Sequence, residues 1–234
     1  AVHNVQNAMF AAAMAHAMGL KLDDIRTGLR TFDTSFFQAP GRMNVFDQHG
    51  FRVIVDYGHN PAAVDAMCTL VDRMVEGGTL GPGGQRRVVL AAPGDRRDED
   101  ILAIATRAAS SFDTFVCRRD DRARGRADTE VPEMLAAGLR ASGVDGNRIA
   151  CIPHEVDAVD AALSAAKPGD LLLIFADQTT RTWKQVIYWG GHPPQPEHAP
   201  AVPQPVREES VPTLVGLNLL RDARGVIVVD EDAD

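Results

Sequence analysis

The sequence has no apolar run that approaches the ~20 residues with which a helix crosses a lipid bilayer. Its first twenty residues contain no Lys or Arg, so the basic region that opens a secretory signal peptide is missing. Lysine is scarce: the chain has three, and none completes the phosphate-binding pattern G-x-x-x-x-G-K-[ST]. These absences argue against a helical membrane protein and against a chain that cradles ATP phosphates in a P-loop by itself.

Cysteine is also rare. Cys68, Cys117 and Cys151 are odd in number, far apart in the sequence and without a C-x-x-C pair. This pattern favours reduced thiols with structural roles in a cytoplasmic protein over a disulfide framework or a zinc site. No group of His, Cys and carboxylate residues has the spacing of metal ligands, so we expect no metal site.

The charge is negative, at −8, with 32 acidic and 24 basic residues. A nucleic-acid partner would require a basic footprint, so we expect none. Hydrophobic residues make up 45% and charged residues 24% of the chain, which is typical of a folded globular protein. The chain does not begin with Met and opens inside a predicted helix, so we expect it to be a piece of a longer protein.

Short Val, Leu and Ile strands alternate with helices along most of the chain. This order predicts an α/β fold: a Rossmann-like, mostly parallel sheet with helices on both faces, opened by a hairpin. The predicted strands are 43–46, 51–55, 87–92, 114–117, 148–152 and 170–175; the predicted helices between and after them are 62–75, 99–110, 131–141, 156–166 and 182–188.

The two ends of the chain differ from this alternating part. Residues 5–19 are rich in Ala and Met and predict a mostly buried helix, which a second helix over 23–29 follows. Residues 192–212 hold seven of the fourteen prolines and predict an extended linker. Two short apolar segments, 214–220 and 226–229, then precede an acidic end, and we expect both segments to pack against other structure.

Ligands of a parallel sheet bind where its strands end, and the polar motifs of this chain follow the predicted strands. Asp56 can accept hydrogen bonds from a ribose diol. Alternatively, Asp56 and Asn60 only cap the helix that begins at Pro61, and His59 lies at the surface. Arg42, after a Pro-Gly turn, can bind phosphate or be solvated.

Three further loops carry dense charge. Asp95, Arg96 and Asp98 suit a zwitterionic ligand, or equally a capped helix start with surface ion pairs. The five arginines of 118–126 are interspersed with aspartates, which favours a solvated loop over a polyanion site. Arg181, with Asp177, belongs to the last strand's carboxyl end and so faces the same edge.

Taken in order, His3-Asn4-x-x-Asn7, Pro40-Gly41-Arg42-Met43 and Asp56-Tyr57-Gly58-His59-Asn60-Pro61 resemble the Mur ligase superfamily of ATP-dependent, amide-forming ligases. Within it, Pro93-Gly94-Asp95-Arg96-Arg97-Asp98-Glu99 and Arg181-Thr182-Trp183-Lys184 most resemble the C-terminal part of the cyanophycin synthetase family. The resemblance covers about residues 1–190.

The resemblance implies three parts: the last helices of a central ATP-binding domain (1–40, incomplete), a C-terminal Rossmann-like domain (41–190), and a Pro-rich linker with an acidic tail (191–234). It also implies ATP and Mg²⁺ as cofactors of a full-length enzyme that is expected to be a homo-oligomer. The enzyme would join arginine to the side-chain carboxylates of a poly-aspartate polymer through an acyl phosphate. Because the P-loop and the metal ligands are not in this sequence, the fragment is expected to be inactive alone.

The resemblance also assigns roles to residues. Asn7 would lie near the adenine, supported by His3 and Asn4, while Arg42 would approach the phosphates and Asp56 would hold the ribose.

On the substrate side, His59 and Asn60 would line the path of the acceptor amine, and Asp95 or Asp98 would receive the guanidinium of arginine. Arg96 and Arg181 complete the predicted substrate-binding set, and residues 118–126 would contact the acidic polymer.

Three alternatives stay open at this point. Folylpolyglutamate synthase and the peptidoglycan-building Mur ligases differ in the amine and carboxylate that they join. The third alternative is a nucleotide-binding module without catalysis.

Overall fold

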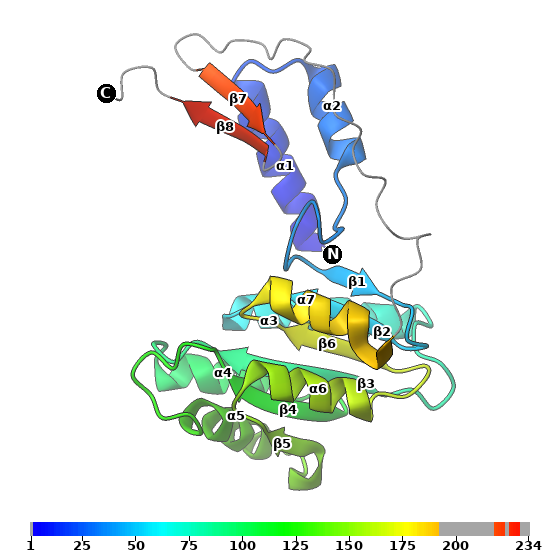
Figure 1. The fold of residues 1–234 in the computed structure, drawn as a ribbon, viewed down its shortest axis with the longest axis vertical. Helices are drawn as coiled ribbons and strands as arrows, with labels where there is room; N and C mark the ends of the chain where they lie inside the picture. Colours follow the sequence, from blue (N-terminus) through cyan, green and yellow to red (C-terminus); the bar gives the residue numbers. More distant parts are fainter. Residues whose placement is uncertain (1, 192–217, 223–224, 230–234) are drawn as a thin grey trace. The chain divides into compact units, whose positions relative to one another are not determined.

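The computed structural model describes residues 2–191, 218–222 and 225–229. The chain divides into two units, residues 1–195 and 196–234. In the first unit a sheet is flanked by helices, and the predicted fold class is confirmed (Figure 1). No helix among the described residues is long and apolar enough to span a membrane.

The sheet of the first unit has six strands in the order β1-β2-β6-β3-β4-β5. All neighbours run parallel except β1, which forms the predicted antiparallel hairpin with β2. The strands are β1 (Asn44–Phe46), β2 (Arg52–Asp56), β3 (Arg86–Ala92), β4 (Thr114–Arg119), β5 (Ile149–Cys151) and β6 (Leu171–Phe175).

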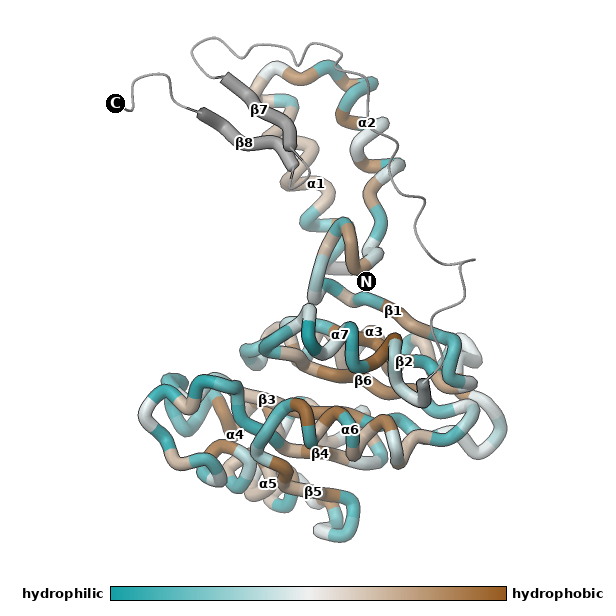
Figure 2. The backbone as a smooth tube through the Cα atoms, in the orientation of Figure 1, coloured by the Kyte–Doolittle hydropathy of each residue, from teal (hydrophilic) through white to brown (hydrophobic). Residues whose placement is uncertain are grey.

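Two hydrophobic clusters show that helices cover both faces of this sheet. One face packs against α3 (Pro61–Glu76), α4 (Asp98–Ala108) and α5 (Glu130–Ala141). The other packs against α6 (Glu155–Ala165) and α7 (Thr179–Tyr188). Because both faces are covered, the central strand β6 is buried throughout. Its residues are apolar, as the colouring of Figure 2 shows.

The connections place four strand ends along one edge. Register pairs Asp56 with Phe175 across β2 and β6, and Ala92 with Arg119 across β3 and β4. The loops after these strands therefore emerge together. The β3–α4 and β4–α5 loops approach so closely that a Cβ added at Gly94 would collide with the backbone carbonyl of Ala123.

The N-terminal helices depart from their predicted burial. Helix α1 (Val2–Ala17) exposes Met9, Phe10 and Met14 to 67%, 69% and 62%. Its neighbour α2 (Leu22–Thr31) has no buried residue. The prediction of a mostly buried helix over residues 5–19 is therefore wrong for this structure. Among the described helices, only α2 packs against α1, and one neighbouring helix has too little surface to cover an apolar helix on all sides.

The strand β4 is longer than predicted. It continues through Arg118 and Arg119, both of which are buried, and Asp120 after them is buried as well, so the prediction of a solvated loop over 118–126 is wrong at these three positions. Backbone pairing explains the extension: Ala91 and Ala92 of β3 are the register partners of the two arginines. The exposed part of the loop begins at Asp121.

In the second unit, β7 (Asn218–Asp222) and β8 (Gly225–Val229) pair as an antiparallel two-stranded sheet. These strands include residues 218–220 of the first apolar segment that the sequence singled out and the whole of the second, 226–229. The predicted linker 192–212 lies outside the described residues, and the packing partner of the apolar segments stays a prediction.

Candidate functional site

A narrow crevice opens where the carboxyl ends of β2, β6, β3 and β4 meet. The helices that follow β2 and β3 cover one face of the sheet, whereas α7, which follows the intervening β6, covers the other. Ligands of open parallel sheets bind between neighbouring strands whose following helices lie on opposite faces of the sheet. The residues that line the crevice come from all four strand ends: Tyr57, Gly58, His59, Ala91, Arg118, Asp120, Phe175, Ala176 and Asp177.

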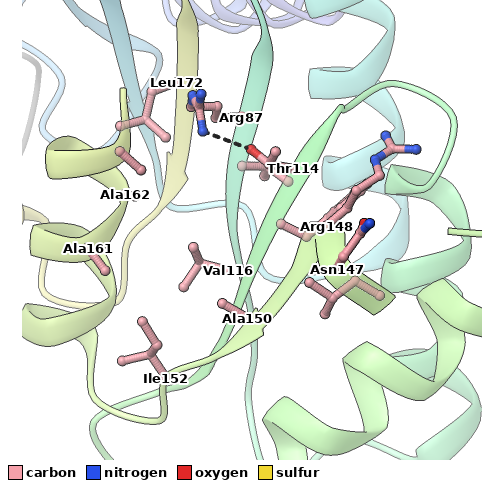
Figure 3. Close-up of a pocket in the computed structure, with 14 residues that line it drawn as sticks. Arg87, Thr114, Val116, Asn147, Arg148, Ala150, Ile152, Ala161, Ala162 and Leu172 are labelled. Carbon is pink, nitrogen blue, oxygen red and sulfur yellow. Dashed lines mark hydrogen bonds between the residues drawn. The ribbon is translucent and has the colours of Figure 1, made fainter. Parts of the chain in front are cut away.

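A larger hollow of about 230 Å³ lies on the sheet face beside α6 (Figure 3). Its lining is mostly apolar, and its two arginines are engaged within the protein. Arg87 donates to Asp170 at 2.6 Å, and Arg148 donates to two backbone carbonyl groups. Ligand sites combine an apolar lining with a few available polar groups. We therefore regard the crevice, and not this hollow, as the candidate site.

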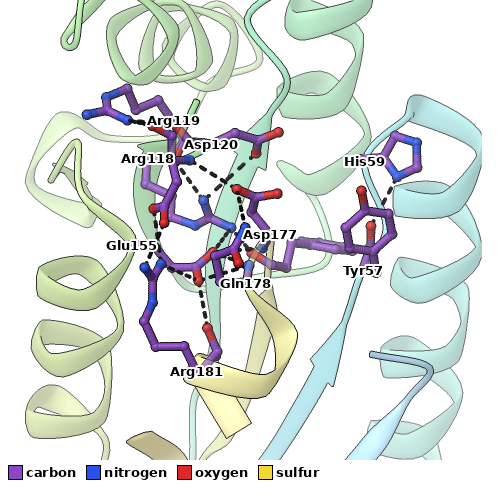
Figure 4. Close-up of polar contacts among 12 residues, drawn as sticks. Tyr57, His59, Arg118, Arg119, Asp120, Glu155, Asp177, Gln178 and Arg181 are labelled. Atoms are coloured by element: carbon purple, nitrogen blue, oxygen red, sulfur yellow. Dashed lines mark hydrogen bonds and ion pairs between the residues drawn. The ribbon is translucent and has the colours of Figure 1, made fainter. Parts of the chain in front are cut away.

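The wall of the crevice is built on a buried ion pair (Figure 4). Arg118 Nη2 lies 2.7 Å from Glu155 Oε2, and neither side chain is exposed. The same guanidinium donates to the backbone carbonyls of Phe175 at 2.6 Å and of Arg119 at 2.7 Å. Burial of two charges is compensated only when both are paired and hydrogen-bonded in this way.

Glu155 also gathers the segment after β6. Its carboxylate accepts the backbone N–H groups of Asp177 at 2.7 Å and Gln178 at 3.2 Å. It further accepts the Thr182 hydroxyl at 2.8 Å and the Arg181 guanidinium at 2.9 Å. One carboxylate at the start of α6 therefore fixes the β6–α7 turn and the first part of α7.

Both members of the pair are ionised. Burial raises the pKa of Glu155, but the Arg118 charge and the hydrogen bonds outweigh burial and hold that pKa below its ordinary value. Burial lowers the pKa of Arg118, and the neighbouring carboxylates oppose that change. An arginine in a protein keeps its proton, so the crevice wall carries a neutralised pair.

Asp120 is a crevice residue whose negative charge the protein neutralises only weakly. It is 7% exposed, and its Oδ1 lies 3.9 Å from Arg118 Nη1. Burial raises the pKa of Asp120 to about 6, a rise that Arg118 reduces and Asp177 increases. The carboxyl is therefore mostly negative at neutral pH although its surroundings disfavour the charge. A bound cation would relieve that cost.

The β2 side of the crevice brings together the predicted residues Asp56 and Arg42. Asp56 is buried; its Oδ1 accepts the N–H of Gly58 at 2.7 Å and its Oδ2 that of Met43 at 3.0 Å. Arg42 is exposed, with its guanidinium carbon 5.8 Å from the centre of the Tyr57 ring.

The residues that follow Asp56 serve different roles. His59 Nδ1 lies 3.1 Å from the backbone oxygen of Tyr57, and the two rings pack together. Asn60 caps α3 by accepting the N–H of Ala63 at 2.9 Å, so the capping alternative holds for this residue.

The β3–α4 loop binds the chain's own arginines. Asp95 accepts from Arg124 at 2.8 Å, and Asp98 accepts from Arg126 at 2.6 Å. Arg126 also donates to the backbone carbonyls of Gly94 and Arg96. Arg96 itself is exposed. The two carboxylates predicted to receive a ligand guanidinium thus already hold guanidinium groups of the neighbouring loop.

Two other predicted residues lie on α1. Asn4 donates to Met43 Sδ at 3.4 Å, which brings it beside the segment that carries Arg42, whereas Asn7 is exposed. The side chain of His3 lies outside the described residues.

Arg181 is predicted to bind substrate, and its guanidinium is held by Asp121 at 2.6 and 3.0 Å as well as by Glu155. These contacts raise the pKa of Arg181, the hydrogen bond that it donates to Asp121 being the largest cause. In this structure Arg181 therefore ties α7 to the β4–α5 loop.

Sequence reasoning missed Glu155 and the burial of Arg118. An acid in the first turn of a helix is a common surface feature, and Glu155 has no other local mark. No Gly or Pro directly follows the predicted strand end at Cys117, so nothing in the sequence stops the strand before Arg118 and Arg119. That continuity was the available signal that the strand continues.

We expect Glu155→Gln to lower the free energy of unfolding by about 3 kcal/mol at pH 7, because Arg118 would lose its charged partner inside the protein. Urea denaturation measures this loss. The control Asp157→Asn removes an exposed acid from the same helix turn and should change stability by less than about 0.5 kcal/mol.

The pH dependence follows from the lowered pKa of Glu155. Its stabilisation is present above the ordinary value of 4.5 and is lost as the pH falls through the lower folded value. The difference between the wild type and Glu155→Gln should therefore shrink in acid. Equal small effects of Glu155→Gln and Asp157→Asn at pH 7 would show that the buried pair does not hold the crevice wall.

Comparison with known proteins agrees with this fold. The model of the family described as "Mur ligase, glutamate ligase domain" matches residues 41–177. The cyanophycin synthetase of Crocosphaera subtropica is 36% identical over 177 residues, which are 76% of this chain and 19% of that protein. The UDP-N-acetylmuramate–L-alanine ligase of Dinoroseobacter shibae is 29% identical over 185 residues, 77% of this chain and 37% of that protein.

Among solved structures, E. coli FolC in complex with ADP, without folate substrate, superposes with a TM-score of 0.57 and 25% identity, covering 77% of this chain and 38% of that chain. This chain thus spans about a fifth of the cyanophycin synthetases that it matches and over a third of FolC. The family model covers more than half of the chain and includes every residue that lines the crevice. The chain belongs to the Mur ligase family, and its residues 41–177 form the family's glutamate ligase domain.

Proposed function

We propose that this chain is the C-terminal part of an ATP-dependent ligase that joins the amine of arginine to carboxylates of an acidic polymer, as its similarity to cyanophycin synthetases suggests. The observation that carries the proposal is the division of charge along one edge of the sheet. Arg42 offers a positive charge on the β2 side, and Asp120 offers a negative one between β6 and β4. A ligase of this class must receive phosphates and a cationic amino acid in one cleft.

The β2 side fits a nucleotide. Both oxygens of Asp56 accept one backbone N–H each, and a carboxylate oxygen has a second lone pair that can accept a ribose hydroxyl. Arg42 is exposed, and a guanidinium fork matches phosphate oxygens. ATP, when bound, supplies the phosphoryl group that activates the carboxylate. The contribution of Arg42 is to neutralise negative charge that develops there.

No described residues form a group of three His, Cys, Asp or Glu that could hold a metal. We propose that the Mg²⁺ ligands of the full-length enzyme lie outside this chain, and we derive no step through the ion.

The β4 and β6 side fits a cation. Asp120 is a buried carboxylate whose ionisation the protein disfavours, so a guanidinium or ammonium group gains more there than at an exposed acid. Asp95 and Asp98 remain proposed contacts of the guanidinium, and to act so they would exchange Arg124 and Arg126 for the ligand. His59 and Asn60 lie at the β2 end of the same edge, where we propose that the amine arrives.

The activity itself is tested on the protein that contains this chain. Phosphate release from ATP should require both arginine and a poly-aspartate primer, and should stop when either is omitted. Release that requires glutamate and a folate, or a nucleotide-linked muramoyl precursor, would assign the chain to another member of the family. The 234-residue chain alone should release no phosphate.

Arg42→Ala should raise the KM for ATP about tenfold in that protein, because a hydrogen bond to a charged group is worth about 1.5–3 kcal/mol. Arg42→Lys should recover part of the loss, since it keeps the charge but not the fork. The control is Arg73→Ala, which removes an exposed arginine from α3. An unchanged KM for ATP in Arg42→Ala would remove Arg42 from the proposed nucleotide site.

Asp120→Asn should raise the KM for arginine about tenfold or more, and it should also stabilise the fold at high pH. The raised pKa means that ionised Asp120 destabilises the folded state above about pH 6, and that this cost disappears below the ordinary value of 3.8. Asp120→Asn should therefore increase the free energy of unfolding by about 1–3 kcal/mol at pH 8 and by little at pH 4.

Urea unfolding at both pH values measures the stability change, and initial rates measure the KM. Asp157→Asn again serves as the matched control for loss of one acid. A variant that is stabilised at pH 8 but keeps its KM for arginine would show that Asp120 is a strained acid without a role in binding the cation.

A further inference from the structure

Two of the three cysteines are neighbours in space although 33 residues separate them along the chain. Cys117 on β4 is the direct register partner of Cys151 on β5, and these strands are parallel. Directly paired residues of adjacent strands point to the same face. Here that face is the one covered by α5: Cys117 belongs to its hydrophobic cluster, and Cys151 Sγ lies 3.6 Å from the carbonyl oxygen of Pro132.

The two thiols differ in access. Cys117 is fully buried, whereas Cys151 is exposed at the edge strand. Their register pairing on neighbouring parallel strands places the two side chains next to each other. An exposed thiol beside a buried one has the arrangement of an attacking and a resolving cysteine, because a reagent from solvent reaches only the first.

The electrostatics agree with these roles. The neighbouring Cys117 side chain lowers the pKa of Cys151 to about 7, with a further contribution from Arg140, while burial and Glu133 oppose the shift. The neighbouring Cys151 side chain, together with burial, raises the pKa of Cys117. By contrast, burial raises the pKa of Cys68 to about 11, so that thiol stays protonated.

The strand geometry permits a bond between the two sulfurs. Adjacent strands lie ~4.8 Å apart, and disulfides span Cα separations of about 4.4–6.8 Å. Directly paired side chains in parallel strands start farther apart than the ~3.8 Å between the Cβ atoms of an unstrained disulfide. Strand β5 is only three residues long and lies at the edge of the sheet, so it can shift to close the gap. A bond made with some strain is also one that thiols reduce readily.

We propose that Cys117 and Cys151 form a reversible intrachain disulfide by exchange with low-molecular-weight disulfides. The Cys151 thiolate attacks one sulfur of the reagent, forms a mixed disulfide and releases one thiolate. Cys117 then loses its proton and attacks the Cys151 sulfur, which releases the second thiolate. The chain gives up two thiol hydrogens and two electrons, and the reagent leaves as two thiols.

The test treats the purified chain with oxidised glutathione and follows its mass and its free thiols. The wild type should lose two thiols and retain no glutathione. Cys117→Ala should instead retain one glutathione on Cys151, because no resolving thiol remains. Cys151→Ser should react at least tenfold more slowly than the wild type, since the two remaining thiols are buried.

The matched control is Cys68→Ser, which removes a buried cysteine outside the pair and should behave as the wild type does. Dithiothreitol should restore both thiols in the wild type. If Cys117→Ala does not fold, peptide mapping of the oxidised wild type decides: a linked peptide pair that contains Cys117 and Cys151 supports the proposal. A wild-type chain that stably retains glutathione, or that links Cys68, overturns it.

Discussion

The contact between Arg118 and Glu155 organises the carboxyl edge of the sheet. Both charges lie out of reach of water, so each must find its partners inside the protein. Arg118 binds the end of β6, and Glu155 binds the turn that follows it and the start of α7. As a result, the last strand, the helix after it and the β4 wall are fixed relative to one another before any ligand is considered.

Around this fixed centre, the exposed loops satisfy one another. Asp95 and Asp98 hold arginines of the next loop, and Asp121 holds Arg181. Exposed ion pairs of this kind add little stability because water screens them and long side chains lose freedom. Partners that are held weakly can be exchanged for ligand groups at small cost, which suits loops that border a binding crevice.

Asp120 differs from these exposed acids because its charge is buried and is not neutralised by a partner of its own. Its carboxyl is buried deeply enough to disfavour ionisation, yet among the described residues its one ion-pair partner within 4 Å is Arg118, which Glu155 already neutralises. The fold therefore carries an unsatisfied negative charge in the crevice. Buried charges that destabilise the fold are common where the charge binds a ligand. A charge that the fold had already neutralised would add little binding free energy.

The sequence by itself determined the alternation of strands and helices, and with it the sheet edge where Arg42, Asp56 and His59 meet. Strand and helix periodicities are local, and the rule that parallel strands end together needs no side-chain detail. Only the tertiary structure decided that α1 stays exposed, that Arg118 is buried against Glu155, and that Cys117 lies beside Cys151. Each of these depends on what packs against a residue from a distant part of the chain, and a charged or thiol side chain carries no local sign of such a partner.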